Sequence, residues 1–155
     1  MRSPRVHVVA GNQLTANQVY LIWQIRDVVF SVEQRVRDVD ADGHDLLPGT
    51  IHMWLTESPG EPLGEPTPVC SYLRVLTAEQ KIGRVCTRRD RRGRGLAGVL
   101  LDEAHRRWGG TELHLGAQAY LQHWYERYGY QVAGPHYDDA GIDHVPMVRP
   151  ARTRP

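Results

Sequence analysis

The sequence lacks most of the features that mark specialised protein classes. Two cysteines in 155 residues are too few for a disulfide scaffold, and the composition, 41% hydrophobic and 24% charged, excludes a disordered or collagen-like chain. No apolar stretch approaches the roughly 18 residues of a membrane span. The start, Met1 to Gly11, has no apolar run of signal-peptide length. We therefore expect one domain over residues 1–155, soluble and cytoplasmic, with no membrane association.

Clustered metal ligands are also missing. Cys70 and Cys86 have no second cysteine or histidine at metal-ligand spacing, so we expect two buried, reduced thiols and no metal site. The acidic stretch from Asp38 to Asp42 copies the first half of a calcium loop. However, Gly49 stands where that loop needs its closing glutamate, and the preceding proline breaks the following helix, so calcium is not expected.

The net charge is also small, at +1, but the charged residues are unevenly distributed along the chain. Residues 88–94 contain five arginines and one aspartate, which leaves the rest of the chain at −3. A nearly neutral total argues against a protein whose whole surface binds nucleic acid. One short segment therefore concentrates the positive charge.

Hydrophobic periodicity predicts alternating strands and helices. The predicted helices are residues 15–35, as one helix or two, 96–108 and 121–128. The predicted strands are residues 6–9, 51–56, 69–76, 82–87, 113–115, 130–137 and 144–148. The proline-rich segment 57–68 predicts a long, stiff hairpin tip. This order predicts an α/β fold with a mixed, mostly antiparallel sheet flanked by helices.

The strongest chemical signal is the turn at residues 92–98, Arg-Gly-Arg-Gly-Leu-Ala-Gly, which lies between a predicted strand and a predicted helix. Glycines let the backbone approach a ligand closely, and the first turn of a helix leaves its N–H groups unpaired. Together with the helix dipole and neighbouring arginines, these groups favour an anion. The turn therefore predicts a site for a phosphate-bearing ligand.

Two other interpretations of this turn are weaker. Gly93, Gly95 and Gly98 satisfy G-x-G-x-x-G, but they do not follow their strand directly, and Gln118 stands near the place of the acidic residue that a dinucleotide site requires. No P-loop motif occurs. A solvated basic turn or a nucleic-acid patch remains open, although no aromatic residues are interleaved with the arginines for base stacking.

Several motifs resemble the GNAT acetyltransferases. Arg92-x-x-Gly95-x-Ala97 is similar to their (Q/R)-x-x-G-x-(G/A) signature, and Trp124 to Tyr130 is similar to their Y-x-(K/R)-x-G-(F/Y) segment. The expected element order is also theirs. Blocks that resemble the ElaA-like subfamily begin at Arg26, Ile82, Gly116 and Gly141. The resemblance covers nearly the whole chain, and it implies the GNAT fold and acetyl-CoA as cosubstrate.

The resemblance also implies which residues bind acetyl-CoA. In GNAT proteins one strand pairs its backbone with the pantetheine arm, and the glycine turn holds the pyrophosphate. The matching strand positions are Val85, Cys86 and Thr87, and Gln118 could bond the pantetheine amides. The matching turn positions are Arg92, Gly93, Arg94, Gly95, Leu96 and Ala97.

The implied reaction moves an acetyl group to a primary amine by direct attack in a ternary complex. An ammonium group must first lose a proton, because its pKa is about 10.4. Tyr125 matches the proton donor for the CoA thiolate, with a core aromatic as the alternative. Glu33 or His52 could be the general base, although each could equally be a solvated or structural side chain. A covalent route through Cys86 is conceivable but is not the family's usual course.

The acceptor and partners stay open at this level. We expect the acidic loop residues to border the acceptor mouth and to attract a cationic amine; they are Asp38, Asp40, Asp42 and Asp45. A non-catalytic acyl-CoA or nucleotide-binding module is the main rival, and a basic nucleic-acid-binding domain is a weaker one. GNAT folds often dimerise, so a homodimer is open.

Overall fold

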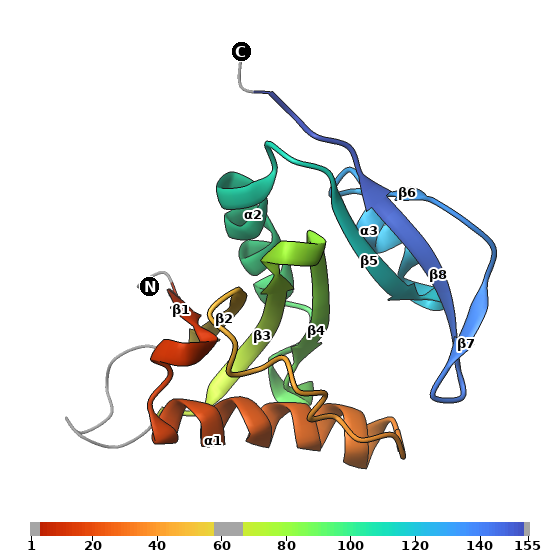
Figure 1. The fold of residues 1–155 in the computed structure, drawn as a ribbon. Helices are drawn as coiled ribbons and strands as arrows, with labels where there is room; N and C mark the ends of the chain where they lie inside the picture. Colours follow the sequence, from red (N-terminus) through yellow and green to blue (C-terminus); the bar gives the residue numbers. More distant parts are fainter. Residues whose placement is uncertain (1–3, 58–66, 154–155) are drawn as a thin grey trace.

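The computed structural model describes residues 4–57 and 67–153. Within them, eight strands form one sheet in the order β1-β2-β3-β4-β5-β8-β6, and β7 pairs with β8 at its edge (Figure 1). The strands are β1 (Arg5–Ala10), β2 (Thr50–Thr56), β3 (Val69–Leu76), β4 (Lys81–Thr87), β5 (Leu113–Gln118), β6 (Gln131–Val132), β7 (Tyr137–Asp139) and β8 (Ile142–Arg149).

Helices cover both faces of this sheet. They are α1 (Ala16–Arg26), α2 (Leu96–Trp108) and α3 (Gln122–Glu126), with a π-helical segment η2 (Asp27–Glu33) that continues α1. Short 3-10 turns lie at η1 (Gly11–Gln13), η3 (Thr77–Glu79), η4 (Arg89–Arg91) and η5 (Ala119–Leu121). None of the helices in the described ranges has the length and apolar character needed to cross a membrane.

Most predicted elements are present. The predicted helix at 96–108 coincides with α2, and the helical stretch from residue 15 becomes α1 and η2, opened by a capping box between Thr15 and Gln18. The predicted strand at 130–137 is wrong: it is two short strands, because Pro135 cannot donate to a sheet ladder. The predicted hairpin tip falls largely on residues 58–66, outside the described residues.

The sheet has two antiparallel halves joined by one short parallel contact. Strands β1 to β4 form one half, and β5, β8, β6 and β7 form the other. The halves are joined at a single parallel pair, Lys81 of β4 with His114 of β5. Beyond that pair the two strands spread apart toward their C-terminal ends, which leaves a V-shaped gap between the ribbons (Figure 1). The predicted mixed, mostly antiparallel sheet is therefore confirmed.

Each face of the sheet has its own apolar core. On one face, α2 buries Leu100, Leu101 and Ala104 in a cluster that includes Leu73 and Val75 of β3. On the other face, the α1–η2 helix buries Ile22, Ile25 and Val29 in a second cluster that includes Tyr72 and Cys86. Burying one large apolar side chain contributes about 2 kcal/mol, so this alternation strongly selects the register of the strands. Both cysteines are buried, unpaired thiols.

Candidate active site

The glycine-arginine turn forms an open backbone cradle at the start of α2. Gly93 and Gly95 have φ angles of +75° and +72°, in the left-handed region that glycine adopts without steric cost. No side chain caps α2, and its first backbone bond runs from the Val99 N–H to the Gly95 carbonyl, 3.2 Å. Among the described residues, nothing accepts from the N–H groups of Leu96 and Ala97. These amides are available to an anion.

Only part of the arginine cluster is free to join that cradle. Arg89 and Arg94 are exposed, and no described carboxylate pairs with them. The other three are paired within the protein: Arg88 with Asp90, Arg91 with Asp90 and Glu57, and Arg92 with Glu33. The local excess of positive charge is therefore smaller than the sequence indicates, and it rests on two side chains.

Arg92 connects the turn to β4 and to η2. Its Nε donates to the Thr87 carbonyl at the end of β4, 2.9 Å, and its Nη2 donates to Oε2 of Glu33 at the end of η2, 2.8 Å. Glu33 is therefore an ion-pair partner of the signature arginine. One of its two carboxylate oxygens is engaged, which restricts the predicted base role to the other oxygen.

Strand β4 carries a bulge beside the gap. Tyr72 of β3 pairs with Cys86, and Arg74 pairs with Gly83, so two β4 residues, Arg84 and Val85, lie opposite one β3 residue. Arg84 has a φ of +54°. A bulge releases backbone groups from the ladder and re-aims them. The predicted pantetheine strand therefore has backbone groups near Val85 that β3 does not use.

Gln118 lies at the wide end of the gap, where β5 ends. Its side-chain amide exchanges hydrogen bonds with Gln34, which directly follows η2, at 2.9 Å and 3.4 Å. The predicted bond of Gln118 to pantetheine stays a prediction. Gln34 is a site residue that sequence patterns did not predict, although it stands in the ElaA-like block that begins at Arg26.

Tyr125 on α3 packs its ring in the core, while its hydroxyl has no hydrogen-bond partner among the described residues. Its ring is 5% exposed and packs edge-on against Trp124 and Tyr130 at centroid distances of 4.8 Å and 5.9 Å. Its hydroxyl makes no hydrogen bond to the part of the chain that the structure describes. Burial raises the pKa of Tyr125 well above its ordinary value, so the phenol keeps its proton at neutral pH and can donate it.

His52 has no free ring nitrogen. It is fully buried; Nε2 lies 2.7 Å from the Asp45 carbonyl and Nδ1 lies 2.7 Å from the Tyr72 hydroxyl. A carbonyl only accepts, so Nε2 carries the proton and Nδ1 accepts from Tyr72. Burial also lowers the pKa of His52. This bonding argues against the predicted base role, and the structural alternative describes His52 better.

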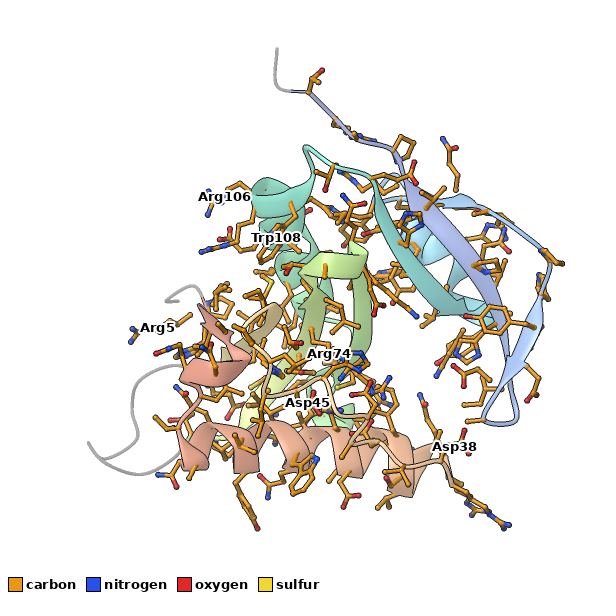
Figure 2. The ribbon with its side chains drawn as sticks, viewed as in Figure 1. Arg5, Asp38, Asp45, Arg74, Arg106 and Trp108 are labelled. Carbon is orange, nitrogen blue, oxygen red and sulfur yellow. The ribbon has the colours of Figure 1, made fainter. Side chains whose placement is uncertain are left out.

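Three of the four aspartates of the acidic loop, Asp40, Asp42 and Asp45, are paired with arginines, which argues against the prediction that they attract an amine. Buried Arg26 holds Asp40 and Asp45 at 2.7 Å and 2.6 Å, and Asp45 also accepts from Arg74. Figure 2 shows Asp45 and Arg74 close together above α1. The remaining pairs of this Arg/Asp network are Arg74 with Asp42, and Arg84 with Asp40 and Asp42. Three arginines and three aspartates therefore compensate one another's charge within this network.

Comparison with known proteins assigns the family. The model of the acetyltransferase (GNAT) domain matches residues 48–150, which include the gap, the cradle and α3. The chain belongs to the GNAT acetyltransferase family. GNAT proteins transfer acyl groups from acyl-CoA, so this chain has an acyltransferase fold with an acyl-CoA site.

Three similar proteins confirm the ElaA-like resemblance. A UPF0039 protein of Mycobacterium tuberculosis is 37% identical over 92% of this chain and 90% of its own length. Protein ElaA of Escherichia coli is 30% identical over 89% of this chain and 91% of its own, and its crystal structure superposes with a TM-score of 0.79. An acyl-CoA N-acyltransferase from Pseudomonas aeruginosa superposes with a TM-score of 0.82 at 32% identity, over 95% of this chain and 99% of that one.

Proposed function

We propose that this GNAT protein is an acetyl-CoA-dependent N-acetyltransferase that acetylates a primary amine by direct attack in a ternary complex. The observation that carries this proposal is the open amide cradle of Gly93 to Ala97, placed at the end of a strand that diverges from its neighbour. The cradle suits a pyrophosphate. Beyond the Lys81–His114 pair, β4 makes no further ladder pair with β5 in the described residues, so this strand edge suits an extended pantetheine arm whose amides pair with Val85, Cys86 and Thr87. The Pseudomonas relative, named an N-acyltransferase, supports transfer to nitrogen.

The reaction then needs a hydrogen-bond donor for the oxyanion, a proton donor for the thiolate and a proton acceptor for the ammonium group. The neutral amine attacks the thioester carbonyl, and an oxyanion forms that a backbone N–H of the β4 bulge near Val85 can stabilise. As the C–S bond breaks, the CoA thiolate takes the proton of the Tyr125 phenol. A proton acceptor for the ammonium group is the third requirement. Burial raises the pKa of the Cys86 thiol, which argues against a covalent acetyl-cysteine step.

Ligand-induced stabilisation tests the proposal directly. We expect acetyl-CoA and free CoA to raise the Tm and NAD to leave it unchanged, because a ligand at 100 times its Kd stabilises the folded state by about 2.7 kcal/mol. Thiol release in the presence of an amine panel then reports turnover. No Tm shift with either CoA form would contradict the proposal. A shift without amine-dependent thiol release would instead support the non-catalytic acyl-CoA-binding module.

Removing the Tyr125 hydroxyl separates chemistry from binding. We expect Tyr125→Phe to lower kcat on the order of 100-fold, because a positioned proton donor typically contributes that much or more, while the acetyl-CoA Kd stays within twofold. Tyr130→Phe is the matched control: this ring is also buried, but its hydroxyl bonds Nε2 of His105 at 2.8 Å. That variant should lose stability and keep kcat. An unchanged kcat in Tyr125→Phe would make Tyr125 a packing residue only.

A further inference from the structure

The hydrogen bonding of His144 leaves one of its ring nitrogens as a free acceptor. Nδ1 lies 2.7 Å from the carbonyl of Ile142, two residues earlier on β8. A carbonyl oxygen can only accept, so in the neutral ring Nδ1 carries the hydrogen and Nε2 carries the lone pair. In the described ranges, no residue bonds that Nε2. The local backbone therefore holds His144 in the tautomer that a proton acceptor needs.

His144 also lies at the wide end of the gap. Its Cα partner across the sheet is Gln118, the last residue of β5, and its partner on the other side is Tyr137 of β7. Val145 is buried in the core beneath α2 and α3, so His144 points to the opposite face of the sheet, which is the face of α1 and η2. Gln118 reaches Gln34 at the end of η2 on this same face.

Within the described residues, no carboxylate bonds the His144 ring. The Tyr137 ring lies alongside it at a centroid distance of 5.6 Å, and neutral Gln118 faces it from β5. The adjacent carboxylate on β8, Asp143, pairs with His136 at 2.9 Å. Within the described residues, His144 makes no ion pair. The ring of His144 is therefore half-buried, with part of its surface accessible to a substrate, and it is not paired with a described carboxylate.

We propose that His144 is the general base of the acetyl transfer, an inference that rests on the proposed function. Its Nε2 takes one proton from the ammonium group, directly or through one water, and the amine nitrogen then forms a bond to the thioester carbon. As the C–S bond breaks, the thiolate takes the Tyr125 phenolic proton, and the second amine proton passes to the Tyr125 oxygen. The amide and CoA thiol leave, and His144 releases its proton to water. Every proton and bond is then accounted for.

The kinetic test uses the full chain and four amines: spermidine, L-lysine, kanamycin and the tripeptide Ala-Ala-Ala. For any amine that the wild type acetylates, we expect His144→Asn to lower kcat/KM about 100-fold and to remove the rising limb of its pH profile, with the acetyl-CoA Kd unchanged. Imidazole should restore part of the activity of His144→Gly, because a free base can enter the vacated space. His114→Asn is the matched control, since His114 lies on the same face at the other end of β5, and it should keep wild-type kinetics.

Glu33→Gln separates the two candidate bases. Because Glu33 pairs with Arg92, we expect this variant to raise the KM for acetyl-CoA and to keep the rising limb. If Glu33→Gln removes that limb, or if His144→Asn retains kcat/KM within threefold, the inference is overturned. A His144→Asn variant that loses acetyl-CoA binding as well would show a structural role and would overturn it too.

An NMR measurement tests His144 without any acceptor. In the ¹⁵N-histidine-labelled chain at pH 8, we expect the His144 Nδ1 to be protonated and the Nε2 to be unprotonated, with the Nε2 signal shifting when acetyl-CoA is added. A protonated Nε2 in the neutral ring would overturn the inference. If the wild type acetylates none of the four amines yet this pattern is found, the failure concerns the proposed acceptor class, and His144 remains supported as a poised base.

Discussion

The Gly95→Glu variant is expected to bind acetyl-CoA at least about 1000-fold more weakly than the wild type. Gly95 caps α2 with a φ of +72°, and among the described residues no atom outside the adjoining backbone lies within 4 Å of the position that a Cβ would take. A carboxylate there points into the open side of the cradle, where the pyrophosphate is proposed to lie. Juxtaposing like charges at a binding site costs several kcal/mol, which corresponds to this loss of affinity. Isothermal titration with acetyl-CoA measures it.

Two controls isolate the cause of that loss. Gly95→Gln has nearly the same size without the charge, so it should retain measurably tighter binding than Gly95→Glu. Gly95→Ala introduces only the cost of a side chain in the left-handed region, about 1–2 kcal/mol of stability. Its Tm should fall while the Kd changes little. Equal affinities for Gly95→Glu and the wild type would place the phosphate site elsewhere on the molecule.

The second large effect is expected on stability. Arg26 is 1% exposed and donates to the Asp40 carboxylate, the Asp40 carbonyl and the Asp45 carboxylate at 2.6–3.0 Å. Arg26→Met keeps an apolar stem but leaves two carboxylates with fewer partners in a partly buried position. Breaking a buried ion pair by removing one partner costs about 3–5 kcal/mol. We therefore expect urea denaturation to show a loss of this size.

A surface pair provides the comparison for Arg26. Arg106 pairs with Glu103 on the outer side of α2 at 2.7 Å, with its side chain more than half exposed. Pairs of this kind contribute about 0.2–1 kcal/mol, so Arg106→Ala should change the free energy of unfolding by less than 1 kcal/mol. A similar small change in Arg26→Met would mean that the Arg/Asp network does not hold the acidic loop in place.

Local patterns predicted much of the fold because their causes are local. The helix at Leu96–Trp108 follows from an apolar stripe at helical spacing and a glycine stop, and the core strands follow from runs of β-branched and apolar residues. The segment 130–137 was predicted as one strand and is two. There the apolar pattern is weak, and Pro135 decides which backbone groups can pair.

The candidate site also combines a local motif that the sequence predicts with long-range pairings that it does not predict. The cradle at Gly93 to Ala97 is a contiguous motif, so its residues and its left-handed glycines could be expected from the chain itself. Pairings between distant residues could not. Glu33 and Arg92 are 59 positions apart and Gln34 and Gln118 are 84 apart, and no local rule states which charged or polar residues meet.

The sequence by itself determined the fold class, the GNAT resemblance and the position of the glycine-rich cradle, because each depends on residues that are neighbours along the chain. Only the tertiary structure decided which charges are unpaired and how many ring nitrogens of each histidine are bonded. The sequence does not distinguish the hydrogen bonding of His52 from that of His144. His52 is bonded at both ring nitrogens, by the Asp45 carbonyl and the Tyr72 hydroxyl, whereas His144 is bonded at Nδ1 alone. The difference arises because the availability of a proton acceptor depends on every partner that folding brings to it.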